Sequence, residues 1–140
     1  MTRVVIDTNI LVSALLQPLG LPAQVFLLAA AGLIELFVSD GIYAEYEEVI
    51  RRPRLKRHAD AIEGVLRTIR EKAVWVKATV VVTAASDPDD NIFLECAQTA
   101  EAHYLVTGNS KDFPAVWQTT RIVTAREFME VFAGAQRRPS

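Results

Sequence analysis

The first apolar run of this chain ends in an acid, a hydroxyl and an amide. Residues 4–6 are all apolar, Asp7, Thr8 and Asn9 follow them directly, and the apolar pattern resumes at Ile10. A carboxylate is costly to bury without a partner, so an acid at the end of an apolar strand has little structural purpose. Asp7 is therefore the first candidate for a residue that does chemistry.

Further acids come next to other predicted elements. Asp87, Asp89 and Asp90 precede a predicted helix in the segment DPDDNIFLECA, and Asp112 follows a predicted strand in YLVTGNSKDF. Ligands of parallel α/β sheets bind outside the carboxyl ends of the strands, so Asp7 and these acids are expected at one edge. The polar neighbours that share the last segment with Asp112 are Thr107, Asn109 and Ser110.

A helix predicted from residue 40 to about residue 51 contributes one more acid. Its apolar positions at 42, 46, 49 and 50 make the buried face. At about 100° per residue, Glu45 lies at the border of that face, whereas Glu47 and Glu48 point further into solvent. Of the acids on this helix, Glu45 is best placed to lean over the sheet edge.

Carboxylates gathered in one cleft repel one another. A pair about 4 Å apart costs on the order of 4 kcal/mol at an effective dielectric of about 20, so a cluster of three or four needs protonation or a cation. Oxygen ligands without supporting His or Cys favour Mg²⁺ or Mn²⁺ over zinc. Such an ion can activate water and stabilise a phosphoryl group under attack. The expected chemistry is phosphodiester hydrolysis.

Taken singly, the acids have simpler explanations. Asp87 and Asp89 suit turns and helix caps, and Asp90 suits the positive end of a helix dipole. Asp112 suits the turn before the Phe-Pro pair that follows it, and Glu45 suits a solvated helix face. It is their expected convergence on one edge that indicates a site.

The elements that must position these acids follow a regular alternation. Short β-branched segments alternate with longer helical patterns, which is typical of a parallel sheet flanked by helices. The expected fold is a single α/β domain with a parallel sheet of about five strands. Strands are predicted at residues 3–6, 36–38, 74–76 or 80–82, 104–107 and 121–123. Residues predicted to begin or cap helices are Pro22, Ser39 or Asp40, Asp60, Asp89 and Thr124.

Composition sets bounds on the domain and its surroundings. The 140 residues are 51% hydrophobic and 23% charged, which fits one folded domain, predicted over residues 3–133 with a flexible tail at 134–140. We expect no membrane span and no signal peptide. The single cysteine, Cys96, cannot form an internal disulfide, which favours a cytoplasmic location. With a net charge of −2, nucleic-acid binding would depend on a local patch.

The densest basic run is RRPRLKRH at residues 51–58. Two explanations stay open: a clamp on RNA phosphates, or a solvated helix end where cations complement the dipole. The candidate RNA-binding residues are Arg51, Arg52, Arg54, Lys56 and Arg57.

Other prominent residues are expected to be structural. Cys96 shares a helix face with apolar residues and is expected to be buried. His103 lacks metal-ligand spacing and is expected to be structural. The leucine-rich segment 15–26 offers more apolar surface than one small sheet buries, which favours a homodimer or a bound partner segment.

Taken together, the motifs resemble one family. The segment VVIDTNILVSALL, the helix that carries Glu45, and the segments DPDDNIFLECA and YLVTGNSKDF are similar in order and spacing to the PIN-domain ribonucleases. The likeness is closest to the PIN-type toxins of bacterial toxin–antitoxin pairs, and it spans residues 3 to about 132. It implies a Mg²⁺- or Mn²⁺-dependent endonuclease acting on RNA, with an antitoxin protein and a second copy of the chain as partners.

The resemblance also implies roles for single residues. Asp7, Glu45 and Asp90 match the first three metal-binding acids. At the fourth position Asn109 stands where some members carry an acid, and Asp112 is the nearest carboxylate, so one metal and two metals both stay open. The predicted catalytic and metal-binding set is thus Asp7, Glu45, Asp90 and Asp112. Polar residues expected to support it are Thr8, Asn9, Thr107, Asn109 and Ser110.

Two other functions stay open. An aspartyl-phosphate phosphotransfer domain also places an Asp after a parallel strand. A phosphatase of that kind needs a second acid two residues later, where this chain has Asn9, and a receiver needs an acid pair after its first strand, where only Asp7 is present. A catalytically silent PIN module that binds RNA or protein would keep the fold and lack an essential acid, and Asp7, Glu45 and Asp90 are all present.

Overall fold

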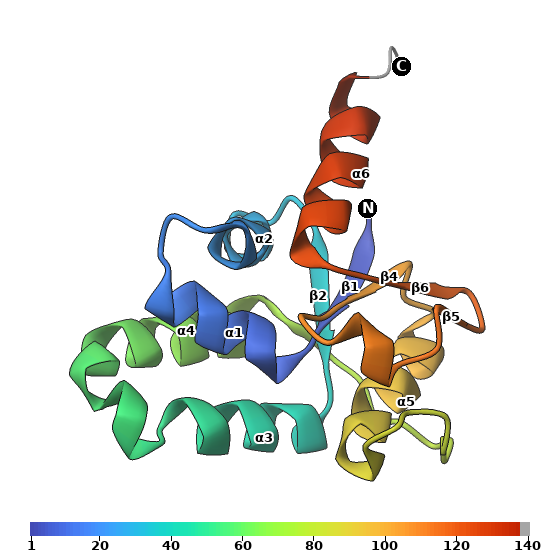
Figure 1. Ribbon diagram of the computed structural model, residues 1–140, viewed down its shortest axis with the longest axis horizontal. Coiled ribbons are helices and arrows are strands. Elements are labelled where there is room, and N and C mark those ends of the chain that lie inside the picture. The colour runs from blue at the N-terminus through green and yellow to red at the C-terminus, as the bar shows by residue number, and fades with distance from the viewer. Residues whose placement is uncertain (138–140) are drawn as a thin grey trace.

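A six-stranded sheet forms the centre of the protein (Figure 1). The computed structural model describes residues 1–137. The strand order is β3-β2-β1-β4-β6-β5, and every neighbouring pair is parallel except β5 with β6. The strands are β1 (Arg3–Ile6), β2 (Glu35–Val38), β3 (Val74–Trp75), β4 (Tyr104–Val106), β5 (Val116–Trp117) and β6 (Thr120–Val123). The expected parallel sheet flanked by helices is confirmed, with one short antiparallel strand added at its edge.

The helices lie on both sides of this sheet. Figure 1 shows α1, α2 and α4 on one side and α5 on the other, while α6 extends beyond the sheet. The α-helices are α1 (Thr8–Leu16), α2 (Leu21–Ala30), α3 (Asp40–Ile50), α4 (Ala59–Lys72), α5 (Asn91–Ala100) and α6 (Ala125–Arg137). Short 3₁₀ turns are η1 (Pro53–His58), η2 (Pro88–Asp90) and η3 (Ser110–Asp112).

The central position of β1 explains its sequence. It lies between β2 and β4, and the side chains of Val4, Val5 and Ile6 are fully buried. Strands covered on both faces are apolar throughout rather than alternating. Helix α1 begins at Thr8, directly after Asp7. The carboxyl end of the central strand therefore delivers Asp7 straight to a helix start.

Several helix boundaries were predicted correctly. The Ser39 hydroxyl accepts a hydrogen bond from the Ile42 amide at 3.3 Å and caps α3. Thr124 and Glu127 form the reciprocal capping box at the start of α6, at 2.9 and 3.1 Å. Helix α6 runs to Arg137, so residues 134–137 of the predicted tail are helical. Residues 138–140 lie outside the described residues.

Two predicted caps were wrong. Helix α4 begins at Ala59, so Asp60 lies in its first turn rather than at its cap. Asp89 does not cap α5, because Pro88 opens the 3₁₀ turn η2 ahead of that helix, and the Asp87 side chain caps this turn by accepting from the Asp89 amide at 3.0 Å.

The segment between α4 and η2 is extended but has little regular structure. Only Val74–Trp75 forms a strand, and the alternative at residues 80–82 does not. The Val82 and Ala85 amides donate instead to the side chains of Glu95 and Asn91 on α5, at 3.0 and 2.9 Å. Side chains of α5 thus replace a sheet ladder in this segment.

No single helix among residues 1–137 is long and apolar enough to cross a membrane. Helices α1 and α2 pass such a test of length and composition only as a pair, bent by 108°.

Candidate functional site

Asp7 sits at the carboxyl edge of the sheet, held between β1 and β4. Its amide donates to the Val106 carbonyl at 2.9 Å and continues the β1–β4 ladder. The side chain is only 5% exposed. Its Oδ2 accepts hydrogen bonds from the Thr107 hydroxyl at 2.7 Å and from the Asn9 side-chain amide at 3.2 Å. The parallel register brings Thr107 to this buried carboxylate, and the start of α1 supplies the second neutral donor, Asn9.

Two hydrogen bonds join α3 to the junction between β1 and α1. The Thr8 hydroxyl donates to Oε2 of Glu45, and the hydroxyl of the fully buried Tyr46 donates to the Ile6 carbonyl. Glu45 and Tyr46 are consecutive, so one turn of α3 is fixed against the residues on either side of Asp7. Glu45 lies at the sheet edge, as its place on the helix predicts.

The loop after β4 is tied to the start of α1. The Gly108 amide donates to Oδ1 of Asn9 at 3.0 Å, and the Asn109 amide donates to the Thr107 hydroxyl at 3.0 Å. Asn9 therefore links Asp7 to the loop that leads to Asp112.

The predicted acids line one cleft with a volume of about 390 Å³. It receives Asp7 from β1, Glu45 from α3, Asp90 from the end of η2 and Asp112 from η3. The other polar or charged residues that line it are Thr8, Asn9, Ser13, Arg54, Asp87, Asp89 and Asn109. Thr107 is completely buried beneath Asp7, and Ser110 is not among the lining residues.

Asp7, Glu45 and Asp90 resist ionisation, because the pKa of each carboxyl is raised. Burial, followed by repulsion from Asp7, Asp87, Glu45 and Asp112, raises the pKa of Asp90 to about 7. Burial also raises the pKa of Asp7, against the hydrogen bond from Thr107 and weaker ones from Thr8 and Asn9. The pKa of Glu45 is raised by burial as well, against the hydrogen bond from Thr8. A bound cation would offset this repulsion.

The donor set fits a hard cation by its chemistry. The converging ligands are carboxylates, which suit Mg²⁺ or Mn²⁺. Among residues 1–137, however, no three acidic, His or Cys side chains stand ready to hold a metal ion. Oxygens of Asp7 and Glu45 instead accept hydrogen bonds from neighbouring hydroxyls and an amide. The cleft therefore supplies suitable ligands but not a closed metal cage.

Comparisons with known proteins agree with this arrangement. The sequence profile of the PIN domain matches residues 3–111. The chain belongs to the PIN domain family. It is 27% identical over 143 residues to the uncharacterized protein MJ1680 of Methanocaldococcus jannaschii, covering 93% of this chain and 91% of that protein.

Two solved structures are similar to this PIN domain. A chain in the crystal structure of VapBC2 from Rickettsia felis, bound to a DNA fragment from their promoter, has a TM-score of 0.57 at 14% identity, covering 86% of this chain and 98% of that one. The PIN domain of human SMG5 has a TM-score of 0.49 at 15% identity, covering 93% and 98%. The likeness to the VapBC2 chain supports the fold.

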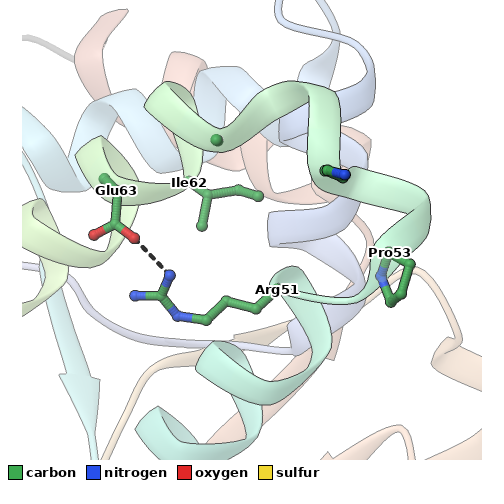
Figure 2. Close-up of a pocket in the computed structure, with 6 residues that line it drawn as sticks. Arg51, Pro53, Ile62 and Glu63 are labelled. Atoms are coloured by element: carbon green, nitrogen blue, oxygen red, sulfur yellow. Dashed lines mark hydrogen bonds and ion pairs between the residues drawn. The ribbon is translucent and has the colours of Figure 1, made fainter.

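The basic run of this PIN domain divides into paired and unpaired cations. Arg51 pairs with Glu63 at 2.5 Å and Glu47 at 3.7 Å, and Arg52 pairs with Glu48 at 2.9 Å. Figure 2 shows the Arg51 side chain reaching across a hollow toward Glu63 on α4.

Arg54, Lys56 and Arg57 belong to none of the ion pairs found between described residues. Arg54 lines the acidic cleft, and Lys56 lines the hollow beside Arg51. Lys56 and Arg57 are not among the residues that line the cleft. The five predicted clamp residues are thus not brought together there.

The residues expected to be structural are so. Cys96 is fully buried, and burial raises the pKa of its thiol to about 12. Nδ1 of His103 accepts a hydrogen bond from the Arg3 amide at 2.8 Å, beside β1.

Sequence analysis missed the role of the Tyr46 hydroxyl. The sequence placed Tyr46 on the buried face of its helix. A buried phenol needs a polar partner, and this requirement could have pointed to a hydrogen bond from its hydroxyl.

Proposed function

We propose that this PIN domain is a metal-dependent endoribonuclease that hydrolyses RNA phosphodiester bonds. The observation that carries the proposal is that four segments far apart in the sequence each bring a carboxylate to one cleft at the carboxyl edge of the sheet. Asp7, Glu45 and Asp90 would hold Mg²⁺ or Mn²⁺, with Asp112 or Asn109 at the fourth position. Bound there, the ion would activate water and stabilise the phosphoryl group under attack.

The other residues of the site orient these carboxylates. Thr107 and Asn9 fix the rotamer of Asp7, and Thr8 fixes that of Glu45. All three donors are neutral, so they orient the carboxylates without cancelling their charge. Asp90 makes no capping hydrogen bond at the start of α5, so none would be lost when it binds a cation.

The first test is cleavage of mixed RNA substrates in Mg²⁺, Mn²⁺ or EDTA. Wild type is compared with Asp7→Asn, which is nearly isosteric but lacks one charge, and with Asp60→Asn, an exposed control on α4. We expect metal-dependent cutting by wild type and Asp60→Asn that disappears in Asp7→Asn and in EDTA. Cutting that persists in Asp7→Asn would contradict the proposed site. A folded wild type that binds RNA without cutting it would favour the silent PIN module.

We further propose a cytoplasmic toxin whose antitoxin covers an apolar hollow between α1, α2 and α4. The hollow has a volume of about 380 Å³, and Leu15, Phe26, Leu27 and Val65 are among its lining residues. Leu27 is 58% exposed, and Leu19, in the α1–α2 connection, is 94% exposed. An apolar hollow with an exposed leucine at its lining is a candidate protein interface. The structural likeness to a VapBC2 chain supports the same partner class.

Expression in a bacterial host tests the toxin role. Wild type should arrest growth, and Asp7→Asn should not, because only the former has the complete acid set. Leu27→Lys places a charge on the proposed interface and should keep toxicity while abolishing rescue by a co-expressed antitoxin. Light scattering of the isolated chain tests whether a second copy of the chain, rather than an antitoxin, covers this hollow. A dimer that Leu27→Lys dissociates would assign this surface to a second copy instead.

A further inference from the structure

Arg54 is the one cation among the described residues that line the acidic cleft. We propose that its guanidinium binds a phosphate next to the one that is cleaved, and so sets the path of a single RNA strand across the cleft. The inference rests on the proposed nuclease function, which it deepens by assigning a substrate contact outside the acid set.

The backbone that carries Arg54 is fixed although its side chain is exposed. Leu55, the next residue, is fully buried, and its amide donates to the Arg52 carbonyl at 2.9 Å. The Arg51–Glu63 pair also ties the end of α3 to α4, across the turn that contains Arg54 (Figure 2). The cation is therefore presented from a rigid turn, which limits the entropy lost on binding.

The neighbouring arginines are already engaged with carboxylates. Arg51 would have to leave Glu63 and Glu47, and Arg52 would have to leave Glu48, before either could bind a phosphate. Arg54 forms no ion pair with a described residue, although the cleft it lines is rich in carboxylates. It therefore keeps its charge available for a ligand, and a guanidinium matches phosphate in a two-pronged hydrogen bond.

The position of Arg54 indicates which phosphate it meets. Helix α3 runs from the side of α5 toward the connection that leads to α4 (Figure 1). From Glu45 to Ile50, the last residue of α3, is about 7.5 Å of helix, and Arg54 lies beyond that end. Val12, Ser13 and Val49 line the same cleft as Glu45 and Arg54. Arg54 thus lies beyond the end of the helix that carries Glu45, from where it would contact a flanking phosphate.

Binding of a short fluorescein-labelled single-stranded RNA tests this contact by fluorescence anisotropy in Mg²⁺. The measurement uses an Asp7→Asn background, so that the RNA stays intact. Arg54→Ala should weaken binding about tenfold, as expected for loss of a charge-assisted hydrogen bond. It should also reduce the slope of log K against log salt concentration by about 0.7, one phosphate contact on a single strand. Arg54→Lys should restore the slope and only part of the affinity.

Arg67→Ala is the matched control, because it removes the same charge from an exposed position on α4 outside the cleft. Equal effects of Arg54→Ala and Arg67→Ala, or no effect of Arg54→Ala, would overturn the proposal. Circular dichroism melting of each variant separates loss of contact from loss of fold. If wild type cuts RNA while Arg54→Ala binds it normally, only the Arg54 contact is refuted. If RNA binds through Arg54 but is never cut, only the nuclease function is refuted.

Discussion

Replacing Asp90 by Asn should stabilise the metal-free protein at pH 8. Asp90 lies at the start of α5, where burial and four neighbouring acids raise its pKa to about 7 from an ordinary value of 3.8. A raised pKa means that the fold disfavours the charged carboxylate. The cost is absent below pH 3.8, grows as the pH rises, and is complete above pH 7. An uncharged amide avoids it at every pH.

The size of the effect follows from two opposing contributions. A pKa of about 7 instead of 3.8 corresponds to about 4 kcal/mol, and solvent screening of this partly exposed side chain reduces it to about 2 kcal/mol. A negative charge at a helix N-terminus is favourable by about 0.3–1 kcal/mol, which the Asn variant forfeits. The net gain is about 1–2 kcal/mol, or roughly 3–6 °C in Tm for a domain of this size. Asp90 makes no capping hydrogen bond, so none is lost.

Thermal unfolding in EDTA at pH 4 and pH 8 measures this difference. The Tm of Asp90→Asn should be higher than that of wild type at pH 8 and equal to it at pH 4. Added Mg²⁺ should raise the Tm of wild type by mass action and raise that of the variant much less. Asp60→Asn serves as the control, because its carboxylate lies in the first turn of α4 away from the cleft, and that variant should lose a few tenths of a kcal/mol. Equal stability of wild type and Asp90→Asn at pH 8 would refute the argument from repulsion.

Three further predictions concern the support of the fold. Tyr46→Phe leaves the buried Ile6 carbonyl without its donor and should cost about 1–3 kcal/mol in urea unfolding; an unchanged midpoint would show that water replaces the hydroxyl. Thr124→Ala removes one half of the capping box with Glu127 and should cost about 1 kcal/mol, seen in the same assay. The buried Cys96 thiol, with its pKa raised to about 12, should react with iodoacetamide at pH 8 only after unfolding; rapid labelling of the native protein would contradict its burial.

Elements with a strong local signal were predicted from the sequence. The central strand β1 is apolar because both of its faces are covered, and its end is marked by the first polar residue, Asp7. Helix α3 carries a regular apolar face, which was enough to single out Glu45 from Glu47 and Glu48. These features depend on residues within one element, so periodicity and strand placement were sufficient to find them.

Features that depend on distant partners were not predicted. The segment at residues 80–82 has strand-like composition, yet the Val82 amide is satisfied by Glu95 on α5. Strand β5 is missing from the prediction, because its hairpin with β6 contains Gln118 at a φ of 53°, a conformation that glycine usually supplies. The Tyr46–Ile6 hydrogen bond likewise joins residues 40 positions apart. Local propensity has no access to such contacts.

The hydrogen-bond donors to Asp7 and Glu45 are neutral, and this determines how much negative charge the cleft keeps. Asp7 and Glu45 are oriented by two hydroxyls and an amide. Arginine or lysine in those places would orient the carboxylates equally well, but would also neutralise them and compete with a metal ion. Neutral donors lower the pKa values only in part and leave the negative potential of the cleft in place, at a cost in stability. The proposed phosphate contact of Arg54, the one cation among the described residues that line the cleft, follows the same logic, because Arg54 makes no ion pair with a described acid and so leaves the carboxylates charged.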